Sequence, residues 1–130
     1  MKRLASALAA TALLWSGAAA AQDRVFMNTK TLAAWCGGAA DPDPAMAFAL
    51  ERACLGELRG FFLTARFYAG QGGAAPPFCA PLDVTVEVVR EVFLDWAAAH
   101  PGLLHQSEIL SLHQAMAAGF PCGPSGRQVR

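Results

Sequence analysis

The sequence predicts a small all-α domain of four helices, stapled by two disulfides and preceded by a signal peptide. Apolar residues recur at helical spacing in four segments, and no segment shows the strict alternation of a strand. All four cysteines lie downstream of an N-terminal apolar stretch with the composition of a secretory signal. Without that stretch, the chain of 130 residues is too short for two domains.

The N-terminus has the three parts of a secretory signal peptide. Basic residues 2–3 precede an apolar run over residues 4–15, and small residues follow over 16–21. Cleavage after Ala21 would satisfy the A-x-A pattern through Ala19 and Ala21. The alternative is a membrane anchor, but the apolar run is shorter than the roughly 20 residues that a bilayer requires. We therefore expect cleavage, with no membrane attachment afterwards.

Cleavage defines the predicted organisation of the chain. Residues 1–21 are the signal peptide, residues 22–122 form the helical domain, and residues 123–130 form a flexible tail without apolar anchors. Removing the signal peptide leaves eight basic residues against ten acidic ones. That balance argues against nucleic acid as a partner, because nucleic-acid binders carry a basic excess. The predicted location is the periplasm or an equivalent oxidising compartment.

The cysteines predict a covalent framework. An even number of cysteines in a small exported domain is read first as disulfides, here two of them, each contributing about 2–4 kcal/mol to stability. A zinc site is the second interpretation, but no two cysteines have C-x-x-C spacing. A catalytic thiol would leave an odd cysteine. Spacing leaves all three pairings open among the four residues, which are Cys36, Cys54, Cys79 and Cys122.

Capping residues and breakers place the first two helices at about residues 29–36 and 44–69 and the fourth at about 107–118. The third begins near residues 83–85 and ends before Pro101. A loop rich in glycine and proline over residues 70–83 separates the second helix from the third, and it is long for a compact domain. A cystine would hold its second half. The expected caps are Asn28, Asp43, a residue from Asp83 to Thr85, and Ser107.

The second predicted helix is apolar on most of its circumference, which is typical of a helix buried at a domain centre. Its main apolar stripe consists of Leu50, Cys54, Leu58, Phe61, Ala65 and Tyr68. A stripe of small residues, where another backbone could approach, consists of Ala49, Ala53, Gly56 and Gly60. Phe48, Leu55 and Phe62 fall opposite the main stripe, among Arg52, Arg59 and Arg66. These arginines form either a solvated ridge or a subunit or partner interface.

The last two helices are amphipathic. The expected inner face of the third consists of Val88, Val89, Val92, Trp96 and Ala99, and that of the fourth of Ile109, Leu112, His113 and Met116. Gly119 and Pro121 are expected to end the fourth helix.

No catalytic constellation emerges from the sequence. His100 lies at a helix end, His105 in a turn and His113 on an apolar stripe, so their spacing does not gather them on one helix face. Glu87 and Glu91 lie on an exposed helix face, and no glycine-rich phosphate loop is present. We predict no enzymatic activity, no metal and no cofactor.

With the helices placed, several short motifs stand in a familiar order. They are Cys54-Leu55-Gly56 with Gly60, Phe78-Cys79-Ala80-Pro81, Val84-Thr85, His100-Pro101 and Phe120-Pro121-Cys122, preceded by the segment Leu32 to Cys36. In this order the chain resembles the Tai/Rap family of amidase immunity proteins associated with bacterial type VI secretion. The resemblance extends from about Asn28 to Cys122.

The resemblance implies a small helical periplasmic protein that binds and occludes a secreted peptidoglycan amidase effector without chemistry of its own. It also implies a homodimer and a protruding loop that reaches the effector. The candidate partner-binding residues are Gln71, Gly72, Gly73, Pro76 and Pro77 in the loop, with Arg52, Arg59 and Arg66 on the helix. The alternative function is a periplasmic structural or stress-related binding module without a toxin partner.

Overall fold

The computed structural model describes residues 27–38, 41–71 and 77–124. It contains four α-helices: α1 (Thr29–Cys36), α2 (Pro44–Gln71), α3 (Val86–Ala99) and α4 (Glu108–Gly119). A short 3-10 helix, η1 (Pro101–Leu103), connects α3 to α4. Across the described ranges there is no strand, and an isolated antiparallel bridge joins Asn28 to Ser107. The all-α prediction is confirmed.

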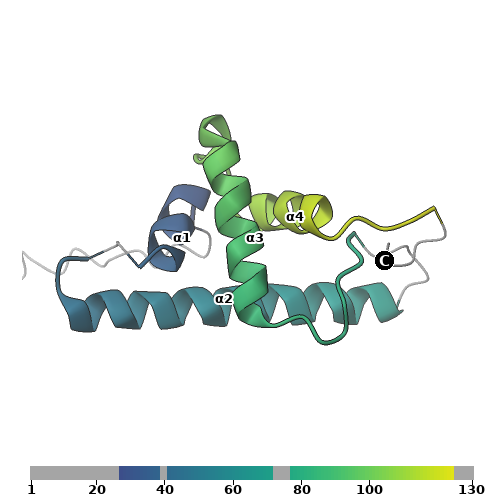
Figure 1. Ribbon diagram of the computed structural model, residues 1–130, viewed down its shortest axis with the longest axis horizontal. Helices are drawn as coiled ribbons and strands as arrows, with labels where there is room; N and C mark the ends of the chain where they lie inside the picture. Colours follow the sequence, from purple (N-terminus) through teal and green to yellow (C-terminus); the bar gives the residue numbers. More distant parts are fainter. Residues whose placement is uncertain (1–26, 39–40, 72–76, 125–130) are drawn as a thin grey trace, which may run out of the picture.

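Helix α2 forms one long edge of the molecule, and α1, α3 and α4 all lie on the same side of α2 (Figure 1). At a rise of about 1.5 Å per residue, its 28 residues extend over roughly 42 Å. Helix α3 crosses α2 steeply, between α1 and α4 (Figure 1). The core lies where the four helices meet, and its fully buried members include Leu32, Cys54, Leu58, Phe93, Leu112 and Met116.

Local chemistry starts each helix as expected, with one exception. The Asn28 side chain accepts a hydrogen bond from the Thr31 backbone N–H at 2.9 Å. Asp43 accepts one from the Ala45 N–H, and Thr85 caps α3 by accepting from the Val88 N–H. Ser107 occupies the cap position of α4, but its side chain makes no capping hydrogen bond. The α4 terminus is held by backbone instead, because the Glu108 N–H donates to the carbonyl of Met27.

Two disulfides are present, and their pairing is Cys36–Cys54 and Cys79–Cys122. The first joins α1 to α2 inside the core. The second joins the segment after residue 76 to the segment that follows α4, where the Cys79 N–H also donates to the carbonyl of Phe120. The two-disulfide prediction is confirmed, and the structure decides among the three pairings.

The prediction that α2 is buried at the domain centre is wrong. One side of α2 packs on the other helices, while its opposite side faces outward, with exposed side chains at Met46, Phe48, Leu63, Phe67 and Tyr68. Tyr68 was expected in the apolar stripe and is 69 % exposed, whereas Phe62, expected on the far side, is buried. Three shorter helices, each of 8 to 14 residues, cannot surround a helix of 28. Within the described chain, nothing lies within 4 Å of a Cβ added at Gly56 or Gly60.

The inner faces of α3 and α4 differ in detail from those expected. In α3, Phe93 and Ala97 are buried beside Val89 and Trp96, while Val88 and Ala99 are exposed. In α4, Ser111 and Ala115 are buried, and Ile109 is 38 % exposed. The faces are rotated because each helix touches two or three others at once, so its buried arc is set by the crossing geometry. Gly119 is the last residue of α4, and α4 ends at its C-cap, Phe120.

No helix in the described ranges is both long and apolar enough to cross a membrane. The predicted signal peptide over residues 1–21 lies outside the described residues, as do Gly72, Gly73 and Pro76 of the loop and all of the tail beyond Pro124.

Candidate functional site

The three arginines of α2 follow one another at intervals of seven residues, so they lie along one face of the helix. Arg52 and Arg59 are exposed, and Arg66 is half-buried. At the N-terminal end of this row, Arg52 lies near Glu87 in the first turn of α3; the pKa of that carboxyl is lowered by hydrogen bonds from its own backbone N–H and from Thr85 and, to a smaller extent, by the charge of Arg52. The row therefore runs along the side of α2 that borders α3.

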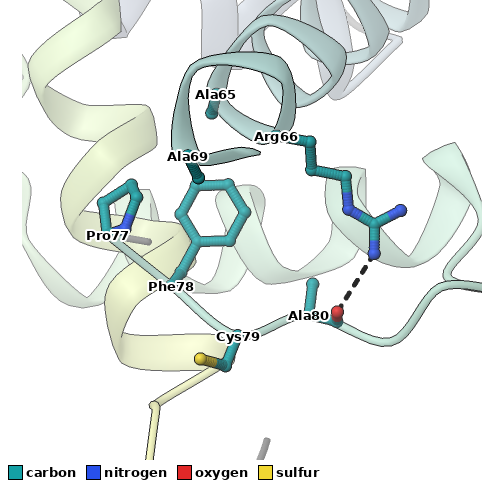
Figure 2. A pocket seen from close by; sticks show the side chains of 7 residues that line it. All are labelled: Ala65, Arg66, Ala69, Pro77, Phe78, Cys79 and Ala80. Carbon is teal, nitrogen blue, oxygen red and sulfur yellow. Dashed lines mark hydrogen bonds between the residues drawn. The ribbon is translucent and has the colours of Figure 1, made fainter. Parts of the chain in front are cut away.

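Arg66 is fixed by contacts inside the chain. Its Nη2 donates hydrogen bonds to the carbonyl oxygens of Ala80 at 3.1 Å and Pro81 at 2.6 Å. Its guanidinium carbon also lies 4.9 Å from the centroid of the Phe62 ring, which is cation–π distance. Figure 2 shows the guanidinium reaching from α2 toward the extended segment that carries Ala80. Arg66 therefore attaches residues 77–81 to α2.

The segment over residues 77–81 has two further attachments. Phe78 is buried, and its ring centroid lies 5.4 Å from that of Phe62 and 6.3 Å from that of Phe61. Cys79 is bonded to Cys122. Pro77, at the start of the segment, is exposed. A hollow of about 230 Å³ lies between this segment and the last turns of α2, bordered by Ala65, Ala69 and Pro77 (Figure 2).

A second hollow of about 260 Å³ lies between α2 and the start of α3, and we call it the α2–α3 groove. Two arginines and seven apolar residues line it. They are Arg59 and Arg66, with Leu58, Phe62, Leu63, Leu82, Val84, Val86 and Val89. The lining includes no acidic residue. The groove thus combines an apolar floor with positive charge at its border.

A third hollow of about 590 Å³, the α2–α4 cleft, lies on the other side of α2. Its lining is mainly apolar and includes Phe61, Tyr68 and Ile109, with Glu57 and His113 as its ionisable groups. The His113 ring meets Phe61 edge-on, with centroids 4.9 Å apart. His113 therefore packs against an aromatic ring at the border of the cleft, beside the core and not within it.

The remaining polar groups show structural contacts. His100 Nδ1 lies 2.7 Å from the carbonyl oxygen of Trp96, and its ring stacks on the Trp96 indole. His105 is exposed. The Arg90 guanidinium pairs with the Glu51 carboxylate at 2.5 Å, between α3 and α2. In the part of the chain that the structure describes, no three His, Cys, Asp or Glu residues gather as a metal site.

The candidate residues predicted from the sequence thus fall at different places. Gln71 is the last residue of α2 rather than part of the loop, and Pro77 begins the segment that Arg66 holds. Arg59 and Arg66 border one groove, while Arg52 does not line it. Sequence reasoning missed Leu63 and Leu82, which line the same groove. Leu82 stands between Pro81 and Asp83 in a turn, away from any periodic apolar stripe. An isolated leucine of this kind indicates an exposed apolar side chain, and this signal could have identified Leu82 from the sequence.

The sequence of this chain matches the model of one protein family. The model of the family of Rap1a immunity proteins matches residues 28–122, which include every described helix. The curated proteins and the solved structures gave no match. The matched range contains both disulfides and both sides of the α2–α3 groove. This chain therefore belongs to the family of Rap1a immunity proteins, whose partners are toxin effectors.

Proposed function

We propose that this chain acts in the periplasm, where it binds a peptidoglycan amidase delivered by a type VI secretion system and occludes its active site. The family match over residues 28–122 carries the proposal, because it identifies an immunity protein. The amidase as target follows from the resemblance between the ordered motifs of this chain and those of amidase immunity proteins.

The covalent framework supports the location. Disulfides form and persist in oxidising compartments such as the periplasm. Both cystines of this chain join elements far apart in sequence, with separations of 18 and 43 residues, so they are structural cross-links. The sequence-predicted signal peptide supplies the route of export.

The surface supports a stoichiometric binder. The α2–α3 groove and the exposed side chains of α2 lie on fixed elements, so little order has to be gained when a partner binds. Arginine next to exposed apolar side chains is the composition enriched at the centre of protein interfaces. In this proposal Arg59, Gln71 and Pro77 contact the effector, together with the loop residues Gly72, Gly73 and Pro76, whereas Arg52 lies outside the contact.

A capture experiment tests this function. The full chain is expressed in the organism that produces it and recovered from the periplasmic fraction in oxidised form. It is then mixed with the proteins that the same organism secretes. We expect one peptidoglycan amidase to be retained at a ratio of one to one, and its release of peptidoglycan fragments to stop at that ratio. An N-terminus at Gln22 would establish export with cleavage. Retention of many unrelated unfolded proteins, with no inhibition of an amidase, would support a general binding module instead.

The resemblance also implies a homodimer. Light scattering of the purified chain, at several concentrations and with and without the amidase, determines whether two copies associate before or during binding. A monomer at all concentrations would separate this chain from the dimeric members of the family.

A further inference from the structure

We infer that the α2–α3 groove is the place where the effector inserts a segment with a carboxylate next to a bulky apolar side chain. This inference rests on the proposed function and adds the chemistry of the bound segment. It is carried by three features of the groove: the charge at its border, the exposure of two leucines, and the fixed position of its outer wall.

The charge at the border selects an acidic partner. The groove lining has two guanidinium groups and no carboxylate. Arg66 already donates to two backbone carbonyls, but Arg59 is exposed, and among the described residues no ion pair involves it. A guanidinium offers several N–H groups in a planar fork that matches a carboxylate. The Arg59 side chain is therefore available to bind an aspartate or glutamate of a partner.

Two exposed leucines select an apolar neighbour for that carboxylate. Leu82 is 92 % exposed and Leu63 is 55 % exposed, although both line the groove. The floor beneath them is buried, with Leu58 and Val89 almost inaccessible to solvent. An apolar side chain placed between the two leucines would remove part of their exposed apolar surface from water. A carboxylate bound to Arg59 would then lie beside a desolvated apolar contact, which strengthens the ion pair.

The outer wall of the groove is fixed before any partner arrives. Leu82 directly follows Pro81, whose carbonyl oxygen accepts a hydrogen bond from Arg66. Three residues before Leu82, the Cys79–Cys122 disulfide holds the same segment to the segment that follows α4. Three residues after Leu82, Thr85 caps α3. A pre-formed wall lowers the entropic cost of binding, so a short segment of a partner can occupy the groove.

Arg52 provides a matched control on the same helix face. It lies two turns before Arg59, is also exposed, and does not line the groove. The variants for the test are Arg59→Ala and Leu82→Ser within the groove, with Arg52→Ala outside it. Because Arg59 and Leu82 are exposed, their replacement leaves the fold intact. The melting temperature of each variant establishes this before binding is measured.

The first part of the experiment uses defined peptides and does not need the effector. Two capped hexapeptides, one alternating leucine with aspartate and one alternating leucine with lysine, are titrated into the 15N-labelled full chain. We expect the acidic peptide to shift the backbone signals of Leu63, Leu82 and Val84, and Arg59→Ala to weaken its binding about tenfold. The lysine peptide should cause no such shifts. Equal shifts from both peptides, or shifts confined to the α2–α4 cleft, would overturn the inference.

The second part uses the amidase retained in the capture experiment. We expect Arg59→Ala and Leu82→Ser each to weaken its binding about tenfold, whereas Arg52→Ala changes it less than about twofold. If the amidase binds all three variants as it binds the parent, the groove is not its contact and the inference fails, although the proposed function stands. If no amidase binds the parent, the proposed function fails. If the groove variants instead convert a dimer into monomers, the occupant is a second copy of this chain and the inference is wrong.

Discussion

Gly119, the last residue of α4, lies against the Val92 side chain of α3 with no room between them for a Cβ atom. From the sequence alone, this glycine was expected to end the helix. In the structure it allows α4 to approach α3 closely, while Phe120 forms the C-cap and Pro121 follows. The close approach makes Gly119 a test of how α3 and α4 pack.

Replacing Gly119 with alanine should destabilise the protein by about 1–3 kcal/mol, because the added methyl group meets a β-branched side chain that cannot rotate away freely. Urea denaturation measures this change. Gly56→Ala is the matched control. Gly56 is also a helical glycine, but no atom lies within 4 Å of a Cβ added there. That substitution should raise stability by about 0.5–1 kcal/mol. Equal effects of the two substitutions would contradict the packing described here.

Arg66→Ala should lower stability by about 1–3 kcal/mol, because the carbonyls of Ala80 and Pro81 lose their charged donor and Phe62 loses its cation–π partner. Chemical denaturation and amide hydrogen exchange over residues 78–82 provide the measurement. The control is Arg59→Ala, which removes the same group from an exposed position and should change stability by less than about 0.5 kcal/mol. A similar loss in both variants would show that Arg66 acts only through charge.

Replacing both Cys79 and Cys122 with alanine should lower the free energy of unfolding by about 4 kcal/mol. A cross-link between residues 43 apart restricts the unfolded chain strongly in the chain-entropy model. The local consequence is faster exchange of the Cys79 N–H, which donates to the carbonyl of Phe120. The measurements are urea denaturation and hydrogen exchange of the oxidised proteins. Unchanged exchange at this amide, or an unchanged midpoint, would contradict the role given to this disulfide.

Thr29→Val should cost about 1–3 kcal/mol although it conserves the shape of the side chain. Thr29 is fully buried at the start of α1, and its hydroxyl donates to the carbonyl of Gln106, next to the hydroxyl of Ser111 in α4. Valine leaves both of these groups without that partner in a place closed to water. Thr64→Val on the exposed surface of α2 is the control and should be nearly neutral. A neutral Thr29→Val would mean that water replaces the lost hydroxyl.

The stability of the protein should fall in acid partly through Glu87. Its backbone N–H and the Thr85 hydroxyl donate to the carboxylate, and with the charges of Arg52 and Arg90 they lower the pKa of Glu87 below its ordinary value of 4.5. A lowered folded-state pKa contributes stability above pH 4.5 that is lost as the pH falls through the folded value. Glu87→Gln should therefore make the midpoint of thermal unfolding less dependent on pH in this range. An identical pH profile for parent and variant would contradict this contribution.

Features of this chain that depend on neighbouring residues could be predicted from the sequence, whereas features that depend on long-range contacts could not. The residues at which α1 and α3 begin could be predicted, because the Asn28 and Thr85 side chains accept hydrogen bonds from free backbone N–H groups three residues further along the chain. The buried arc of α2 could not be predicted, because it depends on how many neighbours the helix has. The same limit explains why Phe93, fully buried in α3, was absent from its predicted face. A periodic pattern gives the spacing of apolar residues, but only neighbouring helices fix which of them lie innermost.

For the candidate site, the sequence identified Arg52, Arg59 and Arg66 as one row but could not tell them apart. The fold separates them by bringing residues 77–82 to the side of α2, so that Arg66 holds a segment, Arg59 borders a groove and Arg52 lies near Glu87. By itself the sequence determined the helices, the side-chain caps of the first three and the number of disulfides, since those features depend on residues a few positions apart or on composition. The tertiary structure alone decided the disulfide pairing, the exposed side of α2 and the position of Leu82 beside Arg59, because each depends on contacts between residues far apart in the chain.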